Sequence, residues 1–300
     1  MSSPSPPFGR VLTAMVTPFT PDGALDLDGA ALLARHLVDA GNHGLVVSGT
    51  TGEAPTTTDE EKQRLLRAVV EAVGADAHVV AGVGTSDTAH STALARTAAA
   101  AGASGVLVVT PYYNKPPQSG VVAHCTAVAD ATDLPVMLYD IPGRSGIAMD
   151  TATIARLAEH PRIVAMKDAK LDLEATSWVL RDTDLAYYSG HDPWTLPLLA
   201  LGAVGVVGTS THFTAAATRE LVDAFVAGQV ARAAELHARL LPAYSGVFRA
   251  PGTILVKAGL RELGLPGGPV RLPLVDATEA ELAALRADLA AAGTPLGVAA

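Results

Sequence analysis

The sequence predicts an α/β protein folded as a (β/α)8 TIM barrel with a C-terminal helical extension. Eight short apolar runs recur along the chain, and a helical pattern follows each of them. The runs are apolar throughout, which is typical of parallel strands buried on both faces. After about residue 229 only helical runs follow. These observations favour one barrel with a helical tail over a doubly wound sheet.

The eight apolar runs are bounded by Gly or Pro and start roughly 18 to 34 residues apart, the length of a strand, loop and helix unit. We expect the strands at residues 11–16, 45–47, 79–83, 106–109, 136–139, 163–166, 186–188 and 204–207.

Helix signals fill the segments between these runs. Residues 28–40 carry Leu and Val at helical spacing, and Gly41 follows where a helix C-cap belongs. Thr58-Asp-Glu-Glu61 has the pattern of a capping box and opens a helix over residues 62–73.

We divide the chain into a disordered leader over residues 1–9, the barrel over residues 10–228 and the helical extension over residues 229–300. The leader lacks the charge and apolar run of a signal peptide. Three helices are expected in the extension, at residues 230–244, 252–263 and 278–291.

Composition excludes several classes of protein. The chain of 300 residues is 49% hydrophobic and 17% charged, as a folded globule is. The net charge of −9 argues against a nucleic-acid or anionic-membrane surface, and no apolar stretch approaches the roughly 20 residues of a membrane span. The single cysteine, Cys125, excludes a disulfide framework. We therefore expect a soluble cytoplasmic protein with no nucleic-acid or membrane partner.

In a barrel of this kind the functional site lies at the C-terminal ends of the strands. Lys167 ends the sixth apolar run, so its side chain is expected to enter the barrel mouth, where burial turns an amine into a nucleophile toward a carbonyl. We expect the other four lysines on helix surfaces or loops. The alternative is that Lys167 merely pairs with a carboxylate such as Asp168.

Four further polar residues follow neighbouring strands. Tyr139 ends the fifth run and has a phenol that can move protons, as Schiff-base chemistry requires; it could equally be a core aromatic. Thr50 and Thr51 offer hydroxyls and amides to an anion, or serve only the turn. Arg144 could pair with a carboxylate of a substrate, or be a solvated loop charge.

Metal and nucleotide signatures are weak. His191, Asp192 and His212 could converge between the last two strands, but no further ligand is apparent, so we predict no metal. The Gly82-Val-Gly84 pair lacks the third glycine of a dinucleotide fingerprint, so we expect no dinucleotide cofactor.

Four motifs stand in order along the chain: Gly49-Thr-Thr-Gly-Glu53, Thr110-Pro-Tyr-Tyr-Asn114, Leu138-Tyr-Asp-Ile-Pro-Gly-Arg-Ser-Gly146 and Val164-Ala-Met-Lys167. Together they resemble the dihydrodipicolinate synthase and N-acetylneuraminate lyase family, and most of all its actinobacterial synthases. The likeness runs from about residue 10 to residue 292. Four collinear motifs at matching spacing are far more specific than any one of them.

The resemblance implies a lyase of lysine and diaminopimelate biosynthesis that condenses pyruvate with L-aspartate 4-semialdehyde to 4-hydroxy-tetrahydrodipicolinate. Lys167 would form a Schiff base with pyruvate, and Tyr139 would relay protons with Thr50 and with Tyr113 of a neighbouring subunit. That donation across an interface implies a homotetramer built as a dimer of dimers. The remaining implied roles concern binding: pyruvate would contact Thr51, Gly190 and Val207, and the semialdehyde carboxylate would contact Arg144. The resemblance implies no metal or redox cofactor.

The chain departs from the family pattern at the barrel rim. The synthases usually carry Gly-Asp-Asp after the seventh strand and Val-Thr-Ala-Asn after the eighth, where this chain has Gly190-His-Asp192 and Thr209-Ser-Thr-His212. A related pyruvate aldolase that acts on another aldehyde or sugar acid is therefore the alternative. A catalytically silent barrel is a third hypothesis, against which the Lys167 and Tyr139 pair argues.

The site at which lysine inhibits some family members is altered as well. Those members carry histidine, then histidine or tryptophan, and an acidic residue where this chain has Asp59, Lys62 and His90. We predict weak or no inhibition by lysine.

Overall fold

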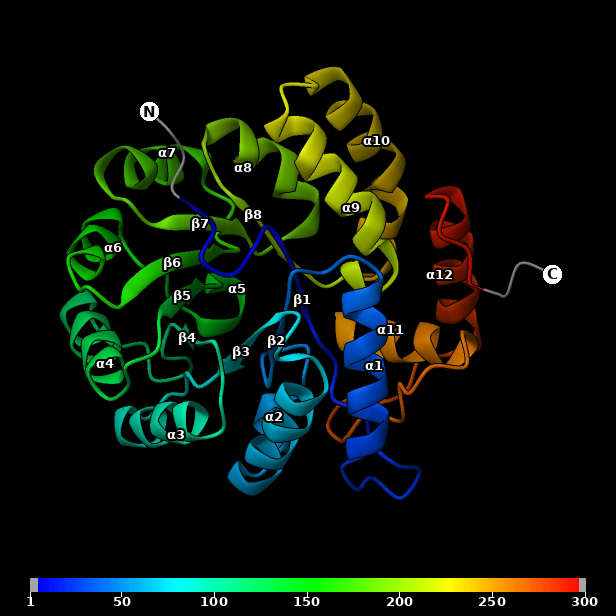
Figure 1. The fold of residues 1–300 in the computed structure, drawn as a ribbon, viewed down its shortest axis with the longest axis horizontal. Coiled ribbons are helices and arrows are strands. Elements are labelled where there is room, and N and C mark those ends of the chain that lie inside the picture. Colours follow the sequence, from blue (N-terminus) through cyan, green and yellow to red (C-terminus); the bar gives the residue numbers. More distant parts are fainter. Residues whose placement is uncertain (1–4, 297–300) are drawn as a thin grey trace.

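The computed structural model describes residues 5–296 and contains a closed barrel of eight parallel strands in chain order (Figure 1). Strand β1 closes the barrel by pairing with β8, with Leu12 opposite Val207. The strands are β1 (Val11–Ala14), β2 (Gly44–Val47), β3 (His78–Gly82), β4 (Gly105–Val109), β5 (Val136–Asp140), β6 (Ile163–Asp168), β7 (Ala186–Ser189) and β8 (Gly205–Gly208). The predicted barrel is confirmed, and no predicted strand end is more than two residues away from the observed one.

A helix follows each strand and covers the outside of the barrel (Figure 1). These helices are α1 (Leu27–Asp39), α2 (Asp59–Val73), α3 (Thr88–Ala100), α4 (Gln118–Asp130), α6 (Thr151–Ala158), α7 (Leu173–Asp182), α8 (Thr195–Leu201) and α9 (Thr211–Val226). Three short turns lie in the loops after the strands: η1 (Ala54–Thr56), α5 (Pro142–Ser145) and η2 (Asp192–Trp194).

The local signals for the helix ends are confirmed. The Thr58 hydroxyl accepts a hydrogen bond from the Glu61 amide, and the Glu61 carboxylate accepts one from the Thr58 amide, so the predicted capping box forms. Gly41, just after α1, has a φ of +110°, a conformation that glycine adopts without strain.

After α9 the chain forms three more helices, as predicted: α10 (Val230–Gly246), α11 (Gly252–Glu262) and α12 (Glu279–Ala291). Thr278 caps α12 with a second capping box. All nine residues from Gly252 to Leu260 of α11 are buried, so this orange helix of Figure 1 is embedded in the protein. The division of the chain at residues 228 and 229 stays a prediction.

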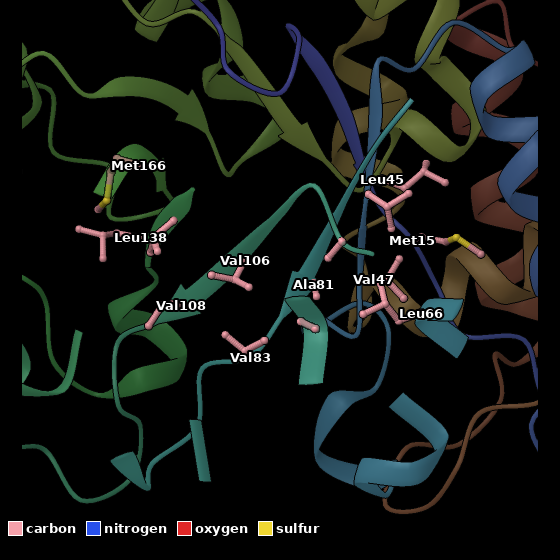
Figure 2. Close-up of a cluster of buried hydrophobic side chains, with 14 of the residues drawn as sticks. Met15, Leu45, Val47, Leu66, Ala81, Val83, Val106, Val108, Leu138 and Met166 are labelled. Atoms are coloured by element: carbon pink, nitrogen blue, oxygen red, sulfur yellow. The ribbon is translucent and has the colours of Figure 1, made fainter. Parts of the chain in front are cut away.

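The core has two layers, because successive side chains of a strand point to opposite faces. Figure 2 shows the outer layer between barrel and helices, in which Leu45, Val106 and Leu138 lie. The inner layer fills the barrel with residues of the opposite parity, among them Val46 and Met137. Each fully buried Val or Leu contributes about 1.5–3 kcal/mol, so the two layers hold the strand ends firmly in place.

Phe8 closes the N-terminal end of the barrel. Its side chain is fully buried, and its ring stands where a side chain at Gly105, the first residue of β4, would have to lie. The Tyr188 hydroxyl, inside the barrel, donates to the Gly9 carbonyl over 2.8 Å. A disordered leader was expected over residues 1–9. Residues 1–4 lie outside the described residues. Phe8 is buried in the barrel, which differs from that expectation.

No helix within residues 5–296 combines the length and the apolar character that crossing a membrane requires.

Candidate active site

Lys167 and Tyr139 lie side by side at the C-terminal ends of β6 and β5. The two residues are paired in the strand register, and both belong to the inward-facing set with Met137 and Ala165. The Lys167 Nζ atom is 4.3 Å from the centroid of the Tyr139 ring, and both side chains are almost fully buried. The strand ends therefore place an amine and a phenol together in the barrel mouth.

Burial changes the acidity of both groups. It lowers the pKa of Lys167 from 10.5 to about 8, although the negative charge of Asp192 acts in the opposite direction. Burial raises the pKa of Tyr139 to about 12, opposed by the charge of Arg144 and by the Thr50 side chain. Near neutral pH a much larger fraction of Lys167 is then the neutral, nucleophilic amine than of an ordinary lysine, which is almost wholly protonated.

Asp168 does not serve as the counter-ion of Lys167. It lies on the outer face of β6, where its carboxylate accepts hydrogen bonds from the Tyr187 hydroxyl over 2.6 Å and from the Thr176 hydroxyl over 3.0 Å. Its other oxygen accepts from the Lys170 amide over 2.5 Å. The alternative that Lys167 merely pairs with this neighbour is therefore wrong.

A cavity at the barrel mouth of about 230 Å³ brings together Tyr139, Thr50 and Arg144. Arg144 extends from the short helix α5, which begins at Pro142, and its side chain is exposed. Apolar residues such as Leu107 and Val109 line much of the remaining wall. A small polar ligand with an anionic group fits this combination of an apolar wall and a cationic rim.

The loop after β2 brings Thr51 to the same end of the barrel. The Thr51 hydroxyl lies 3.5 Å from the Thr209 hydroxyl, which follows β8. Gly190 follows β7, and a Cβ atom there would come within 3.0 Å of the Lys167 side chain, so only glycine fits without displacement. Val207, on β8, is buried in the inner layer of the barrel.

Tyr113 is the exception among the predicted site residues. It does not line the cavity, its side chain is 93% exposed, and its φ of +73° is one that residues other than glycine rarely adopt. The structure thus brings seven of the eight predicted residues to one end of the barrel and leaves Tyr113 projecting into solvent.

His212 is not among the residues that line the mouth cavity, contrary to the expectation that it could converge there with His191 and Asp192. It is fully buried, its Nε2 atom accepts from the Val16 amide over 3.2 Å, and its Nδ1 atom is 2.8 Å from the Thr209 carbonyl oxygen. Burial lowers its pKa to about 4, so it is a neutral link between the segments that follow β1 and β8. Within residues 5–296 no three His, Cys, Asp or Glu side chains are placed to hold a metal ion.

Asp192 is also part of the scaffold. Its buried carboxylate accepts hydrogen bonds from the Ser210 amide over 2.9 Å and from the Ser210 hydroxyl over 2.5 Å. It thereby joins the loop after β7 to the loop after β8 and leaves one negative charge near Lys167.

Comparison with known proteins agrees with this geometry. The model of the dihydrodipicolinate synthetase family matches residues 7–292. The chain belongs to this family. A 4-hydroxy-tetrahydrodipicolinate synthase of Acidothermus cellulolyticus is 67% identical, over 96% of the chain and 93% of that protein. The 4-hydroxy-tetrahydrodipicolinate synthase 2 of Streptomyces coelicolor is 61% identical, over 98% of the chain and 99% of its own length.

The fold is shared with solved structures of the dihydrodipicolinate synthase family. The crystal structure of the enzyme from Cyanidioschyzon merolae, described with lysine bound, superposes with a TM-score of 0.95 at 43% identity. The match covers 97% of this chain and 100% of that one.

One buried ion pair was not predicted from the sequence. Lys257 was expected on a helix surface or loop, but it is fully buried in α11 and forms an ion pair with Glu53. A lysine inside the otherwise apolar run Ile254-Leu-Val-Lys-Ala258 was the available signal. A charge that is surrounded by apolar residues on all sides of a helix needs a buried partner.

Proposed function

We propose that the protein condenses pyruvate with L-aspartate 4-semialdehyde to give 4-hydroxy-tetrahydrodipicolinate, a step of lysine and diaminopimelate biosynthesis in the cytoplasm. The observation that carries the proposal is the buried amine of Lys167, with a pKa near 8, beside the Tyr139 phenol in the barrel mouth. Relatives that are 61% and 67% identical carry the name of this activity.

In the first half-reaction the neutral Lys167 amine attacks the C2 carbonyl of pyruvate. The carbinolamine loses water and becomes an iminium, and loss of a proton from C3 gives an enamine. Desolvation at the barrel mouth supports this step because it supplies neutral amine near physiological pH.

In the second half-reaction the enamine carbon attacks the aldehyde of the semialdehyde. The amino group of that substrate then displaces Lys167 from C2, closing the ring and freeing the enzyme. Pyruvate and the semialdehyde thus give the cyclic product and one water, and no oxidant or reductant is consumed.

Tyr139 would donate and accept the protons of these steps, with Thr50 and with Tyr113 of a neighbouring subunit. The strained backbone and nearly complete exposure of Tyr113 support a role outside its own subunit. This arrangement goes with a homotetramer built as a dimer of dimers.

The two substrate carboxylates would have separate partners. Thr51, with the backbone of Gly190 and Val207 nearby, would hold pyruvate close to Lys167. The guanidinium of Arg144, on the exposed wall of the cavity, would pair with the carboxylate of the incoming semialdehyde.

The test is reductive trapping. Borohydride added to the protein with pyruvate should attach a pyruvate-derived mass to the peptide that contains Lys167, and the Lys167→Arg variant should give none. Lys170 lies three residues away and serves as an internal control. An adduct on Lys170, or no adduct in the unaltered protein, contradicts the mechanism. A screen of aldehydes with pyruvate then tests the acceptor, and preference for a sugar-derived aldehyde would contradict the proposed substrate.

A further inference from the structure

We propose that Lys257 and Glu53 are positioning residues for this reaction, through a buried ion pair by which helix α11 holds the Thr50–Thr51 loop in place. The inference rests on the proposed function, because that function gives both threonines their roles. The two residues are 204 positions apart in the sequence, so the contact joins the C-terminal extension to the loop after β2.

The ion pair is enclosed on all sides. The Lys257 Nζ atom donates to the Glu53 carboxylate over 2.5 Å and to the Pro269 carbonyl over 2.7 Å. The Phe19 ring covers the ammonium, with its centroid 4.2 Å from Nζ. The side chain of Lys257 is 0% exposed and that of Glu53 is 2% exposed.

The second oxygen of Glu53 is held as well. It accepts a hydrogen bond from the Arg271 amide over 2.8 Å. The Arg271 guanidinium forms a two-armed pair with Glu61 on helix α2, over 2.6 and 2.9 Å. Both oxygens of Glu53 are therefore fixed by groups from the C-terminal extension, one of which is itself anchored to the barrel.

Glu53 transmits this restraint to the loop through its backbone. Its φ of +55° lies in the left-handed region, and its amide donates to the Thr50 carbonyl over 3.2 Å. A tight turn thus connects the buried carboxylate to Thr50.

Helix α11 contacts the loop at a second point. The Thr253 hydroxyl donates to the Thr51 carbonyl over 3.1 Å. Thr253 and Lys257 are four residues apart, so they lie on one face of the helix. One helix face therefore holds the loop on both sides of Gly52, and no residue of α11 is among those that line the cavity.

The chemistry of the pair argues for positioning over stability. A buried ion pair is often no more stabilising than well-packed apolar residues of the same size, because desolvation offsets the attraction. It does fix direction, since both partners require particular hydrogen bonds. A displacement of about 1 Å at a reacting group can lower a rate about 100-fold, so a fixed loop matters for catalysis.

Thr253 offers the mildest test. Thr253→Val removes the hydroxyl that bonds to the loop, at nearly constant side-chain volume. Loss of this one hydrogen bond should raise KM for pyruvate about three- to tenfold, with a smaller change in kcat. Thr253→Ser retains the hydroxyl and should restore the affinity. Equal KM values for the two variants would overturn the proposal.

Lys257 offers the stronger test. Lys257→Met leaves the Glu53 charge buried without its partner, so both the melting temperature and kcat/KM should fall. In the double variant Lys257→Met with Glu53→Gln the charge is gone, so the melting temperature should recover while kcat/KM stays about tenfold or more below that of the unaltered protein. Recovery of both together would mean a purely structural role and would refute the inference. Arg286→Ala, which removes an exposed ion pair between α11 and α12, is the control and should leave the kinetics unchanged.

Hydrogen exchange separates this inference from the proposed function. The amides of residues 48–57 should exchange faster in Thr253→Val and in the double variant than in the unaltered protein and in Arg286→Ala. If the unaltered protein forms no borohydride adduct, the proposed function fails, and the exchange rates still decide whether α11 holds the loop. If the adduct forms and exchange is the same in all variants, only the positioning inference fails.

Discussion

The ammonium nitrogen of Lys167 lies 4.3 Å from the centre of the Tyr139 ring, at paired positions of strands β6 and β5. The backbone register sets this separation, so it does not depend on a flexible loop. Every step proposed for the reaction involves one of these two groups, so the charges around them determine how the rate responds to pH and to substitution.

The rate should depend on pH through Lys167. Burial lowers its pKa to about 8, and only the neutral amine attacks the carbonyl. Because protonation removes the nucleophile, kcat/KM for pyruvate should rise as pH increases through about 8 and then level off. The rate of borohydride trapping against pH measures this directly. A rise that continues to the ordinary pKa of 10.5 would show that the amine is not desolvated.

Asp192 should set the position of that rise. Its carboxylate favours the charged form of Lys167, so Asp192→Asn should move the midpoint of the pH profile to lower pH. The Asn oxygen can still accept from the Ser210 amide, which keeps the loop bond. Trapping rates of the variant across the same pH range give the midpoint, and a shift to higher pH would contradict the assigned electrostatic effect.

Tyr139→Phe should remove the proton relay and keep the fold. The ring fills the inner layer of the barrel, and Phe preserves that packing while it deletes the hydroxyl. Loss of a general acid–base group lowers kcat by about 10²- to 10⁴-fold. Steady-state kinetics test the loss of the proton relay, and a melting curve tests whether the fold is kept. A variant that melts normally and retains wild-type kcat would exclude the phenol from the chemistry.

Arg144→Ala should weaken binding of the semialdehyde without affecting the reaction with pyruvate. Arg144 lies on the exposed wall of the cavity, and Lys167 is not among the residues that line it. Loss of a guanidinium–carboxylate pair costs about 1.5–3 kcal/mol, which corresponds to roughly a 10- to 100-fold rise in KM for the semialdehyde. Pyruvate trapping on Lys167 should proceed at the normal rate, and equal damage to both measurements would place Arg144 elsewhere in the mechanism.

The sequence was sufficient for the barrel and for the reacting pair, because both depend on local patterns. Strand runs such as 136–139 alternate their side chains between two faces, so Tyr139 and Lys167 could be placed at the ends of inward-facing rows. The capping box at Thr58 is equally local, since both its partners lie within one turn.

The sequence was insufficient where a side chain bonds to a distant part of the chain. The position of His212 in the sequence suggests a ligand at the barrel rim. In the structure its ring is buried and accepts a hydrogen bond from the Val16 amide, 196 residues away. Lys257 was expected at the surface because it is charged, but its ion pair with the Glu53 carboxylate makes its burial possible. Neither partner is recognisable from neighbouring residues, because only closure of the barrel and docking of α11 bring them together.

Lysine should inhibit the enzyme weakly or not at all. Lysine-inhibited members of the family carry an acidic residue where this chain has His90, and histidine where it has Asp59. In this chain the Asp59 carboxylate lies 2.9 Å from the His90 Nε2 atom. Lys62, the third altered position, adds a positive charge near Asp59, which repels the amino groups of a lysine ligand. Activity measured at increasing lysine concentration should stay constant through the millimolar range. The triple variant Asp59→His, Lys62→His and His90→Glu restores the family's residue types and should become more sensitive; inhibition of the unaltered protein at sub-millimolar lysine would disprove the assignment.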